Sequence, residues 1–247
     1  MRRLRRAPET LPVETGTHDG LAYSLWLPGR EPLGGIVILH GAGSCKESHH
    51  DFARVAIGAG FAAVAFDQRG HGASAGPMDA RVLNDVEGVA GLLRERMADP
   101  ALPITLRGSS MGGYLAILAA PLVGAASVVA ICPAGADGLR RALAGGALQF
   151  DADRRSLDAF LQEHDLYVAV ESLEIPLLLL HAEGDEQVPL QHSRELAARA
   201  RHPASRLIAM PGGHHRSIQH DPELQAVSIR FVERAPRIPG PEQPAGG

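Results

Sequence analysis

The sequence predicts an α/β fold, in which helices flank a mostly parallel central sheet. An almost continuous apolar run at residues 175–181 is typical of a parallel strand that is buried on both faces. A second apolar strand, at residues 102–107, leads through a glycine-rich turn into a helix at residues 113–120. The length of 247 residues suits one large domain of this class with a substantial core.

The other strands of this sheet follow from the same pattern of short apolar runs. They are predicted at residues 35–39, 61–66, 127–131 and 205–210. Between the strands at residues 127–131 and 175–181 lies a segment of another kind, with a charged, helical-looking run at residues 153–170. We therefore expect helices there, outside the sheet.

A serine with the surroundings of a nucleophile stands between a predicted strand and a predicted helix. Residues 108–112 (Gly-Ser-Ser-Met-Gly) match G-x-S-x-G, a turn that strains the serine backbone and projects its hydroxyl. Glycines are needed on either side because side chains there would collide. A second match, at residues 72–76, runs into a proline and not into a helix, so Ser74 is interpreted as part of a loop. Ser110 is therefore the predicted nucleophile.

Acid and base partners for such a serine follow it in the chain. A serine hydroxyl is a poor nucleophile near neutral pH, so it needs a histidine to take its proton and a carboxylate to orient that histidine. Asp185 follows one predicted strand, and the adjacent His214 and His215 follow the next. Serine, aspartate and histidine thus each lie past the carboxyl end of a separate strand. Only one of the two histidines can face Ser110.

A glycine-rich turn after the strand at residues 35–39 completes the predicted site. The turn reads His40-Gly41-Ala42-Gly43, and its glycines would let backbone N–H groups face a developing oxyanion. By position, the N–H groups of Ala42 and Met111 are the predicted donors.

These motifs resemble those of the α/β-hydrolase superfamily, over about residues 20 to 233. The turn at residues 40–43 resembles the superfamily's oxyanion turn, and residues 108–112 resemble its nucleophile elbow. Residues 67–74 (Asp-Gln-Arg-Gly-His-Gly-Ala-Ser) are similar to the D-x-R-G-H-G-x-S loop of many members. That loop explains the second G-x-S-x-G match.

The resemblance implies a catalytic triad of Ser110, Asp185 and His215. The pattern Gly-Gly-x-His-Arg at residues 212–216 is the closest match to the base region of similar hydrolases, which places the base at His215 and leaves His214 at a variable position. Asp137 is the alternative acid, because some members carry the acid after the preceding strand. The role of Asp185 and the choice of histidine are therefore expectations to be compared with the structure.

The activity that the resemblance implies is acyl transfer by a serine hydrolase. A carboxylic ester or a thioester is the expected substrate, cleaved through an acyl-enzyme intermediate. An amide or peptide hydrolase on the same scaffold is the alternative, and so is a non-catalytic ligand-binding protein with the hydrolase fold. The motifs are specific for the superfamily and not for one substrate.

The resemblance also divides the chain. Residues 1–19 are expected to be a basic N-terminal tail and lead-in, and residues 20–233 the α/β-hydrolase domain. Residues 234–247 are rich in Pro and Gly and are expected to be a disordered C-terminal tail. Residues 135–172 stand where the superfamily inserts a cap, so they form either a small lid or a surface helix pair.

Composition limits the classes of partner. The net charge of −4 gives no electrostatic reason to expect nucleic acid or an anionic membrane. No apolar run suits a signal peptide or a transmembrane helix, so a soluble, cytoplasmic protein is expected. The expected partner is a small-molecule acyl substrate, while the sequence does not determine the oligomeric state.

Neither a cofactor nor a metal is expected, because the predicted chemistry needs none. A metal-dependent hydrolase is the rival interpretation, since His49-His50 and His214-His215 supply pairs of ligand type. Adjacent histidines point in different directions, however, and the chain has no His-Glu-x-x-His helix. The two cysteines, Cys45 and Cys132, fall in separate regions, so no disulfide framework is expected.

Overall fold

The computed structural model describes residues 10–234. The segments 1–9 and 235–247 lie outside the described residues. All but residue 234 of the expected disordered tail, and residues 1–9 of the expected N-terminal tail and lead-in, are therefore outside the described residues.

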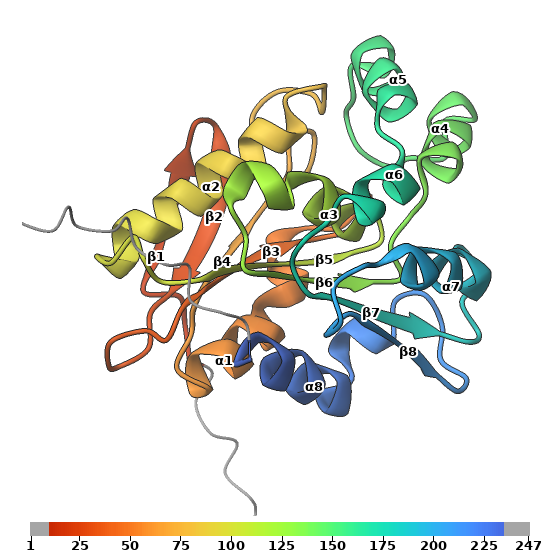
Figure 1. Ribbon diagram of the computed structural model, residues 1–247. Coiled ribbons are helices and arrows are strands. Elements are labelled where there is room, and N and C mark those ends of the chain that lie inside the picture. Colours follow the sequence, from red (N-terminus) through yellow and green to blue (C-terminus); the bar gives the residue numbers. More distant parts are fainter. Residues whose placement is uncertain (1–9, 235–247) are drawn as a thin grey trace, which may run out of the picture.

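An eight-stranded sheet runs through the middle of the molecule in the order β1-β2-β4-β3-β5-β6-β7-β8 (Figure 1). Strand β2 pairs antiparallel with β1 and with β4, and every other pair is parallel. The predicted mostly parallel sheet is thus confirmed. The strands are β1 (Glu14–His18), β2 (Leu21–Trp26), β3 (Gly35–Leu39), β4 (Ala62–Phe66), β5 (Ile104–Ser109), β6 (Ser127–Ile131), β7 (Leu177–Ala182) and β8 (Arg206–Met210).

The first strand lies within the segment that the sequence analysis assigned to a tail and lead-in. Strand β1 pairs with β2 along its whole length, from Glu14 opposite Leu25 to His18 opposite Leu21. Most of its residues are exposed, so it lacks the apolar run that marks the inner strands. The sheet therefore begins at Glu14, before the domain boundary expected at residue 20.

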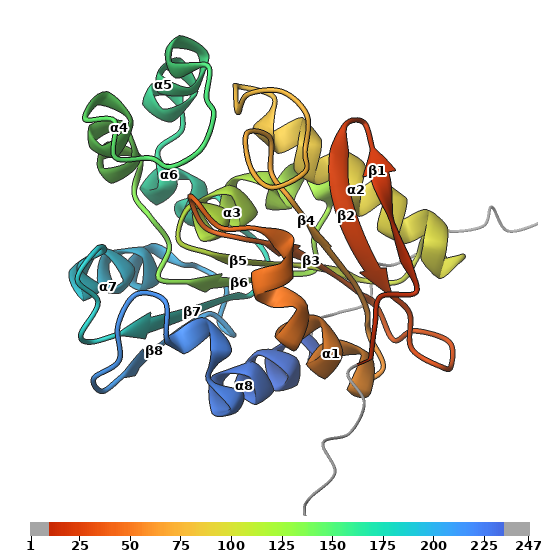
Figure 2. The ribbon, with the colours of Figure 1, turned by 180° about the vertical axis from the view of Figure 1, so that it is seen from behind.

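Helices cover both faces of the sheet (Figures 1 and 2). Helices α2, α3 and α7 pack on one face, and α1 and α8 pack on the other. The helices are α1 (His50–Gly58), α2 (Val82–Met97), α3 (Met111–Val123), α4 (Ala136–Ala144), α5 (Arg154–Glu163), α6 (Leu166–Glu171), α7 (Leu190–Arg199) and α8 (Pro222–Val232), with 3₁₀ turns η1 (Lys46–His49) and η2 (Ile218–His220).

Alternate residues of the inner strands enter different halves of the core. In β3, Val37 and Leu39 join the cluster beneath α2 and α3, whereas Ile36 and Ile38 join the cluster beneath α1 and α8. All four are buried, which explains why such a strand reads as a continuous apolar run. Because β3, β5, β6, β7 and β8 are parallel, the loops after their carboxyl ends meet along one edge of the sheet.

The segment expected to be a lid or a surface helix pair folds into α4, α5 and α6. Figures 1 and 2 place α4 and α5 beyond the sheet, with α6 between them and α3. The predicted helical run at residues 153–170 is divided in two, because Asp165 accepts a hydrogen bond from Tyr167 N at 2.7 Å and caps the start of α6. The Tyr114 hydroxyl of α3 donates to the His164 carbonyl at 2.8 Å, and this bond attaches the segment to α3.

Within residues 10–234, no helix combines the length and the apolar character that crossing a bilayer requires.

Candidate active site

Ser110 occupies the turn between β5 and α3, with a positive φ of 52° and a ψ of −118°. A residue other than glycine is strained in this region, so the surrounding structure must hold it there. A Cβ atom on Gly108 would collide with the carbonyl oxygen of Gly112, and one on Gly112 would collide with the carbonyl oxygen of Leu39. The two glycines of the motif are therefore required by close backbone packing.

Asp185 and His215 are brought together from the loops after β7 and β8. Nδ1 of His215 lies 2.7 Å from Oδ2 of Asp185, and their side chains are only 6% and 0% exposed. The other carboxylate oxygen, Oδ1, accepts the N–H groups of Gln187 and Val188, each at 2.8 Å. These bonds hold the carboxylate with one oxygen directed at the histidine.

The electrostatics of this pair favour an ionised aspartate. Burial by itself would raise the pKa of Asp185, but the hydrogen bonds from His215 and from the Val188 N–H outweigh it and hold that pKa well below its usual range. An ionised Asp185 accepts from Nδ1–H of His215. A neutral His215 then carries its lone pair on Nε2, which is the state a general base requires.

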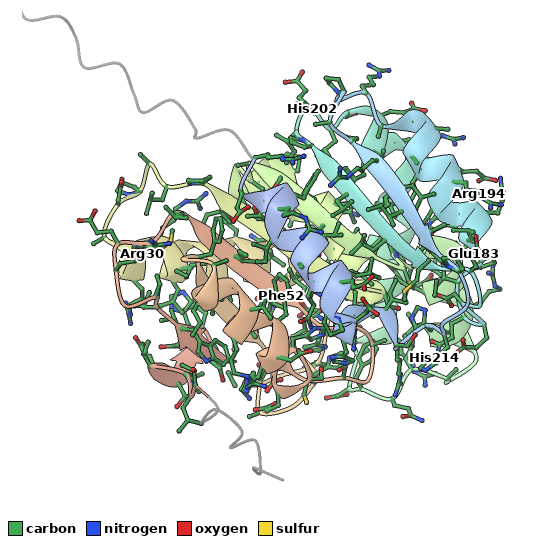
Figure 3. The ribbon with its side chains drawn as sticks, turned by 90° about the horizontal axis from the view of Figure 1, so that it is seen from below. Arg30, Phe52, Glu183, Arg194, His202 and His214 are labelled. Carbon is green, nitrogen blue, oxygen red and sulfur yellow. The ribbon has the colours of Figure 1, made fainter. Side chains whose placement is uncertain are left out.

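The two residues that sequence reasoning weighed against this pair lie elsewhere. His214 is exposed and projects from the loop at the outer margin of the molecule (Figure 3). Asp137 is exposed in the first turn of α4, where it lines the same cleft as Ser110, and within residues 10–234 it has no hydrogen bond or ion pair with His215. The structure thus pairs His215 with Asp185 and not with Asp137.

The turn after β3 lies against Ser110, the predicted nucleophile. A Cβ atom on Gly41 would be 3.3 Å from Cβ of Ser110, so only a glycine allows this approach without displacement. Ala42 lines the same cleft as Ser110. Met111 is the first residue of α3, so its N–H has no acceptor within the helix. Both predicted oxyanion donors are therefore backbone N–H groups beside Ser110.

The oxyanion turn is held by the loop at residues 67–74. Gly43 N donates to Nε2 of His71 at 3.1 Å, and Gln68 N donates to Nε2 of His40 at 3.0 Å. Burial lowers the pKa of His40 to about 4, so its ring is neutral at pH 7 and can accept that bond. Two histidines thus fix the turn on either side of Ala42.

The chain is similar to several known proteins. The profile of the family described as serine aminopeptidase, S33, matches residues 30–150. A protein of Escherichia coli O157:H7, named "Uncharacterized protein YfhR", is 30% identical over 219 residues, which cover 82% of this chain and 72% of that protein. A monoacylglycerol lipase of Mycolicibacterium smegmatis is 27% identical over 251 residues, which cover 84% of this chain and 89% of that protein.

Solved structures show the same fold. A soluble variant of the monoglyceride lipase of Saccharomyces cerevisiae, in complex with a substrate analog, superimposes with a TM-score of 0.73 at 16% identity, over 93% of this chain and 96% of that one. The chain belongs to the α/β-hydrolase superfamily. The expectation drawn from its motifs is confirmed at this level.

In this α/β hydrolase, Ser74 lies in a loop, and its hydroxyl bonds to neighbouring backbone groups. Its hydroxyl donates to the Asp67 carbonyl and accepts the N–H of Ala22 at 2.9 Å. The Asp67 carboxylate is buried and accepts from the backbone N–H and from Nζ of Lys46, at 2.7 and 2.8 Å. The second G-x-S-x-G match therefore lies in a loop whose polar groups are already bonded to one another.

Cys132 is a neighbour of the hydrolase site that sequence reasoning missed. Its thiol hydrogen-bonds to the Asp185 carboxylate, and its Sγ lies with an Asp185 oxygen and a His215 nitrogen in a group spanning at most 4.8 Å. Burial, and then the bond to Asp185, raise the pKa of Cys132, so the thiol keeps its proton and acts as donor. The only sequence signal was its place at the end of a strand beside the other motifs.

The side chains of Cys132, Asp185 and His215 form the one group in residues 10–234 whose ligand atoms could bind a metal ion together. A metal there would replace the proton shared by His215 and Asp185 and would disrupt the pair. Of the histidine pairs behind the rival interpretation, His49, His50 and His214 belong to no such group in the described residues. Both cysteines are free, as expected.

A cleft of about 510 Å³ opens at Ser110 and is walled by α4, α6 and α7 of the hydrolase. Its lining is part apolar and part polar, and the polar side chains include Tyr167 and His192. The Tyr167 hydroxyl donates to Glu195 at 2.9 Å and lies 2.9 Å from Nδ1 of His192. His215 does not line this cleft. In the described part of the chain, the Ser110 hydroxyl makes no hydrogen bond to the His215 ring. Catalytic hydrogen bonds of this kind often shorten only when substrate binds.

Proposed function

We propose that this hydrolase cleaves carboxylic esters through an acyl-enzyme intermediate, with Ser110 as nucleophile, His215 as general base and then acid, and Asp185 as the group that orients His215. The observation that carries the proposal is the 2.7 Å bond between His215 and a buried Asp185, at the sheet edge where the strained Ser110 also lies. The relatives support ester hydrolysis, since several are named as lipases or esterases.

The first step is attack of Ser110 Oγ on the ester carbonyl carbon. His215 Nε2 takes the hydroxyl proton, because Nδ1 already donates to Asp185. The resulting imidazolium is stabilised by the ionised carboxylate. It then protonates the leaving alkoxide, so that an alcohol departs and Ser110 carries the acyl group. Water, deprotonated by the same histidine, attacks the ester of Ser110 and releases the carboxylic acid.

The N–H groups of Ala42 and Met111 stabilise the oxyanion that forms in both steps. Removing one such donor costs about 2.7–4 kcal/mol of transition-state stabilisation in enzymes that use it. The turn containing Ala42 is fixed by His40 and His71 before substrate arrives, so little reorganisation is needed when charge develops.

An ester of a small polar alcohol, such as a monoacylglycerol, is the proposed substrate class. The cleft beside Ser110 offers polar side chains, among them Gln187 and His192, that can hydrogen-bond free hydroxyl groups. The lipases among the relatives are named for monoacylglycerols. Thioesters and amides are weaker alternatives, and the description of the matching profile as an aminopeptidase makes an aminoacyl amide a necessary comparison.

The test is labelling with a fluorophosphonate probe followed by a substrate panel. Separate samples of the purified chain and of Ser110→Ala are incubated either with the probe or, unlabelled, with a short-chain monoacylglycerol, a thioester and an aminoacyl anilide. Labelling of the wild type alone, with fastest turnover of the monoacylglycerol, supports the proposal. Absence of labelling would refute the serine mechanism, and faster cleavage of the anilide would move the assignment to an amidase.

A further inference from the structure

Arg107 is a fully buried arginine in the strand that ends at the nucleophile. It lies in β5, and its side chain is on the face covered by α1 and α8, beside Ile38 of β3 and Val129 of β6 in register. Its relative exposure is 1%. The neighbouring positions on this face are apolar, so an aliphatic residue would fit the local environment better than a cation.

The guanidinium has few partners for a buried charge. Its central carbon lies 3.7 Å from the centre of the Phe52 ring in α1, and Figure 3 looks onto the region where α1 and α8 meet around Phe52. Nη2 donates to the carbonyl oxygen of Gln219 at 3.1 Å. In the described residues, Nε and Nη1 have no hydrogen-bond partner. Burial lowers the pKa of Arg107 to about 9, so the group is still a cation at pH 7.

The bond to Gln219 reaches the loop that carries the base. Gln219 belongs to the 3₁₀ turn η2, which begins three residues after His215 in the chain. The same turn is held by α1, since His220 Nδ1 lies 2.9 Å from Oδ2 of Asp51. Gln225 of α8 donates to that same oxygen at 2.7 Å and to the Gln219 carbonyl at 3.2 Å. Strand β5, helix α1 and the base loop (residues 212–221, which carry His215) thus meet at one polar cluster.

Burial is the main influence on the pKa of Arg107, and the negative charge of Asp51 opposes it. The other neighbour of the cation, His49, is neutral. His49 of η1 is buried, and burial first, then the charge of Arg107, hold the pKa of His49 well below its usual value. In the described residues its two ring nitrogens have no partner. His49 therefore cannot neutralise Arg107, and the carbonyl of Gln219 is the one acceptor that the structure gives the guanidinium.

We propose that Arg107 is a positioning residue, which fixes the loop carrying His215 against the strand carrying Ser110. A charge buried with so few partners destabilises a fold relative to an apolar side chain of similar size. The arginine adds a directional hydrogen bond across the sheet face. This bond joins the strand that carries Ser110 to the loop that carries His215. Its effect on turnover rests on the proposed function, whereas its effect on the loop does not.

The experiment compares Arg107→Met, Arg107→Lys and a matched control. Methionine keeps an unbranched apolar chain but removes the charge and the donor, and lysine keeps a cation that can reach one carbonyl. Arg94 is the control, because its Nη2 also donates to a backbone carbonyl, that of Val123 at 2.6 Å, at the far end of α3 from Ser110. Each folded variant is measured for kcat and KM on a short acyl ester and for hydrogen exchange of residues 212–221.

For Arg107→Met we expect a fall in kcat of about 100-fold with KM within about twofold of wild type, because misplacement of a catalytic group impairs chemistry more than binding. Exchange in residues 212–221 should rise roughly tenfold, with β4 unchanged as internal reference. Arg107→Lys should recover part of both losses, and Arg94→Met should match the wild type in both.

Unchanged exchange in residues 212–221 of Arg107→Met would overturn the proposal, and so would exchange that rises equally in β4. If Arg107→Met does not fold, Arg107→Lys decides, since the proposal requires intermediate exchange confined to the base loop. Loss of exchange protection in that loop together with a wild type that does not hydrolyse esters would refute the proposed function and leave the positioning role supported.

Discussion

Nδ1 of His215 lies 2.7 Å from Oδ2 of Asp185, although the two residues follow different strands. The aspartate cannot readily turn away, because its other oxygen accepts two backbone N–H groups from its own loop. The histidine ring is consequently held with Nδ1 toward the carboxylate. This orientation leaves Nε2 as the nitrogen available for proton transfer.

The first prediction separates the two serines that match G-x-S-x-G. Ser110→Ala should abolish ester hydrolysis and fluorophosphonate labelling, because it removes the attacking oxygen. Ser74→Ala should keep labelling and most of the activity while losing about 1 kcal/mol of stability, since its hydroxyl only bridges Asp67 and Ala22. Gel detection of the probe and thermal melts of both variants are the measurements. A Ser74→Ala protein that melts normally but is not labelled would contradict the assignment.

The second prediction concerns the acid. Asp185→Asn should reduce kcat by roughly 10⁴-fold, because an amide neither fixes the required tautomer nor stabilises the imidazolium. Asp137→Asn, the matched control, should retain near wild-type turnover, because Asp137 is exposed in α4. Steady-state kinetics on both variants decide the matter. Loss of activity in Asp137→Asn with activity kept in Asp185→Asn would reverse the assignment.

The third prediction concerns the adjacent histidines. His215→Ala should remove nearly all turnover while KM changes little, because the base acts in the transition state and not in substrate binding. His214→Ala should have a mild effect, since this side chain is exposed. Kinetic constants for the two folded variants provide the comparison. Near wild-type turnover in His215→Ala is incompatible with the proposed mechanism.

The fourth prediction tests the thiol beside the acid. Cys132→Ala should raise the pKa of Asp185, because it removes one of the hydrogen bonds that lower it. The unfolding free energy that is lost between about pH 5 and pH 2 should then be smaller than in the wild type, because the folded and unfolded pKa values of Asp185 lie closer together. Cys132→Ser keeps a donor and should lie closer to the wild type. Equal losses for Cys132→Ala and the wild type in urea titrations would show that the thiol does not act on the carboxylate.

The fifth prediction is a pH dependence of stability. The pKa of Asp185 is lowered on folding, so the ionised group stabilises the native state above its unfolded pKa of about 3.9, and this contribution is lost as the pH falls through lower values. The difference in unfolding free energy between wild type and Asp185→Asn should therefore be constant above about pH 5 and should shrink toward pH 2. Urea titrations across this range measure it. A difference that grows on acidification would have the wrong sign.

Local sequence patterns were sufficient for strands β3 to β8 and for the turn at Ser110. Strands buried on both faces are continuous apolar runs, and the glycines at 108 and 112 mark a turn in which side chains would collide with backbone. Strands β1 and β2 were not predicted, and the exposed β1 is defined by pairing with β2 and not by apolar residues. Asp165 interrupts a helical run that composition alone would continue.

By itself, the sequence determined the class of fold, the order of the serine, acid and base motifs, and the residue types that each needs. These are properties of segments a few residues long, in which periodicity and backbone sterics act locally. Only the tertiary structure decided that His215 and not His214 meets Asp185, that Cys132 donates to the same carboxylate, and that Arg107 reaches the base loop. Each of these contacts joins loops or elements that follow different strands, so it exists only once the parallel strands have been set side by side.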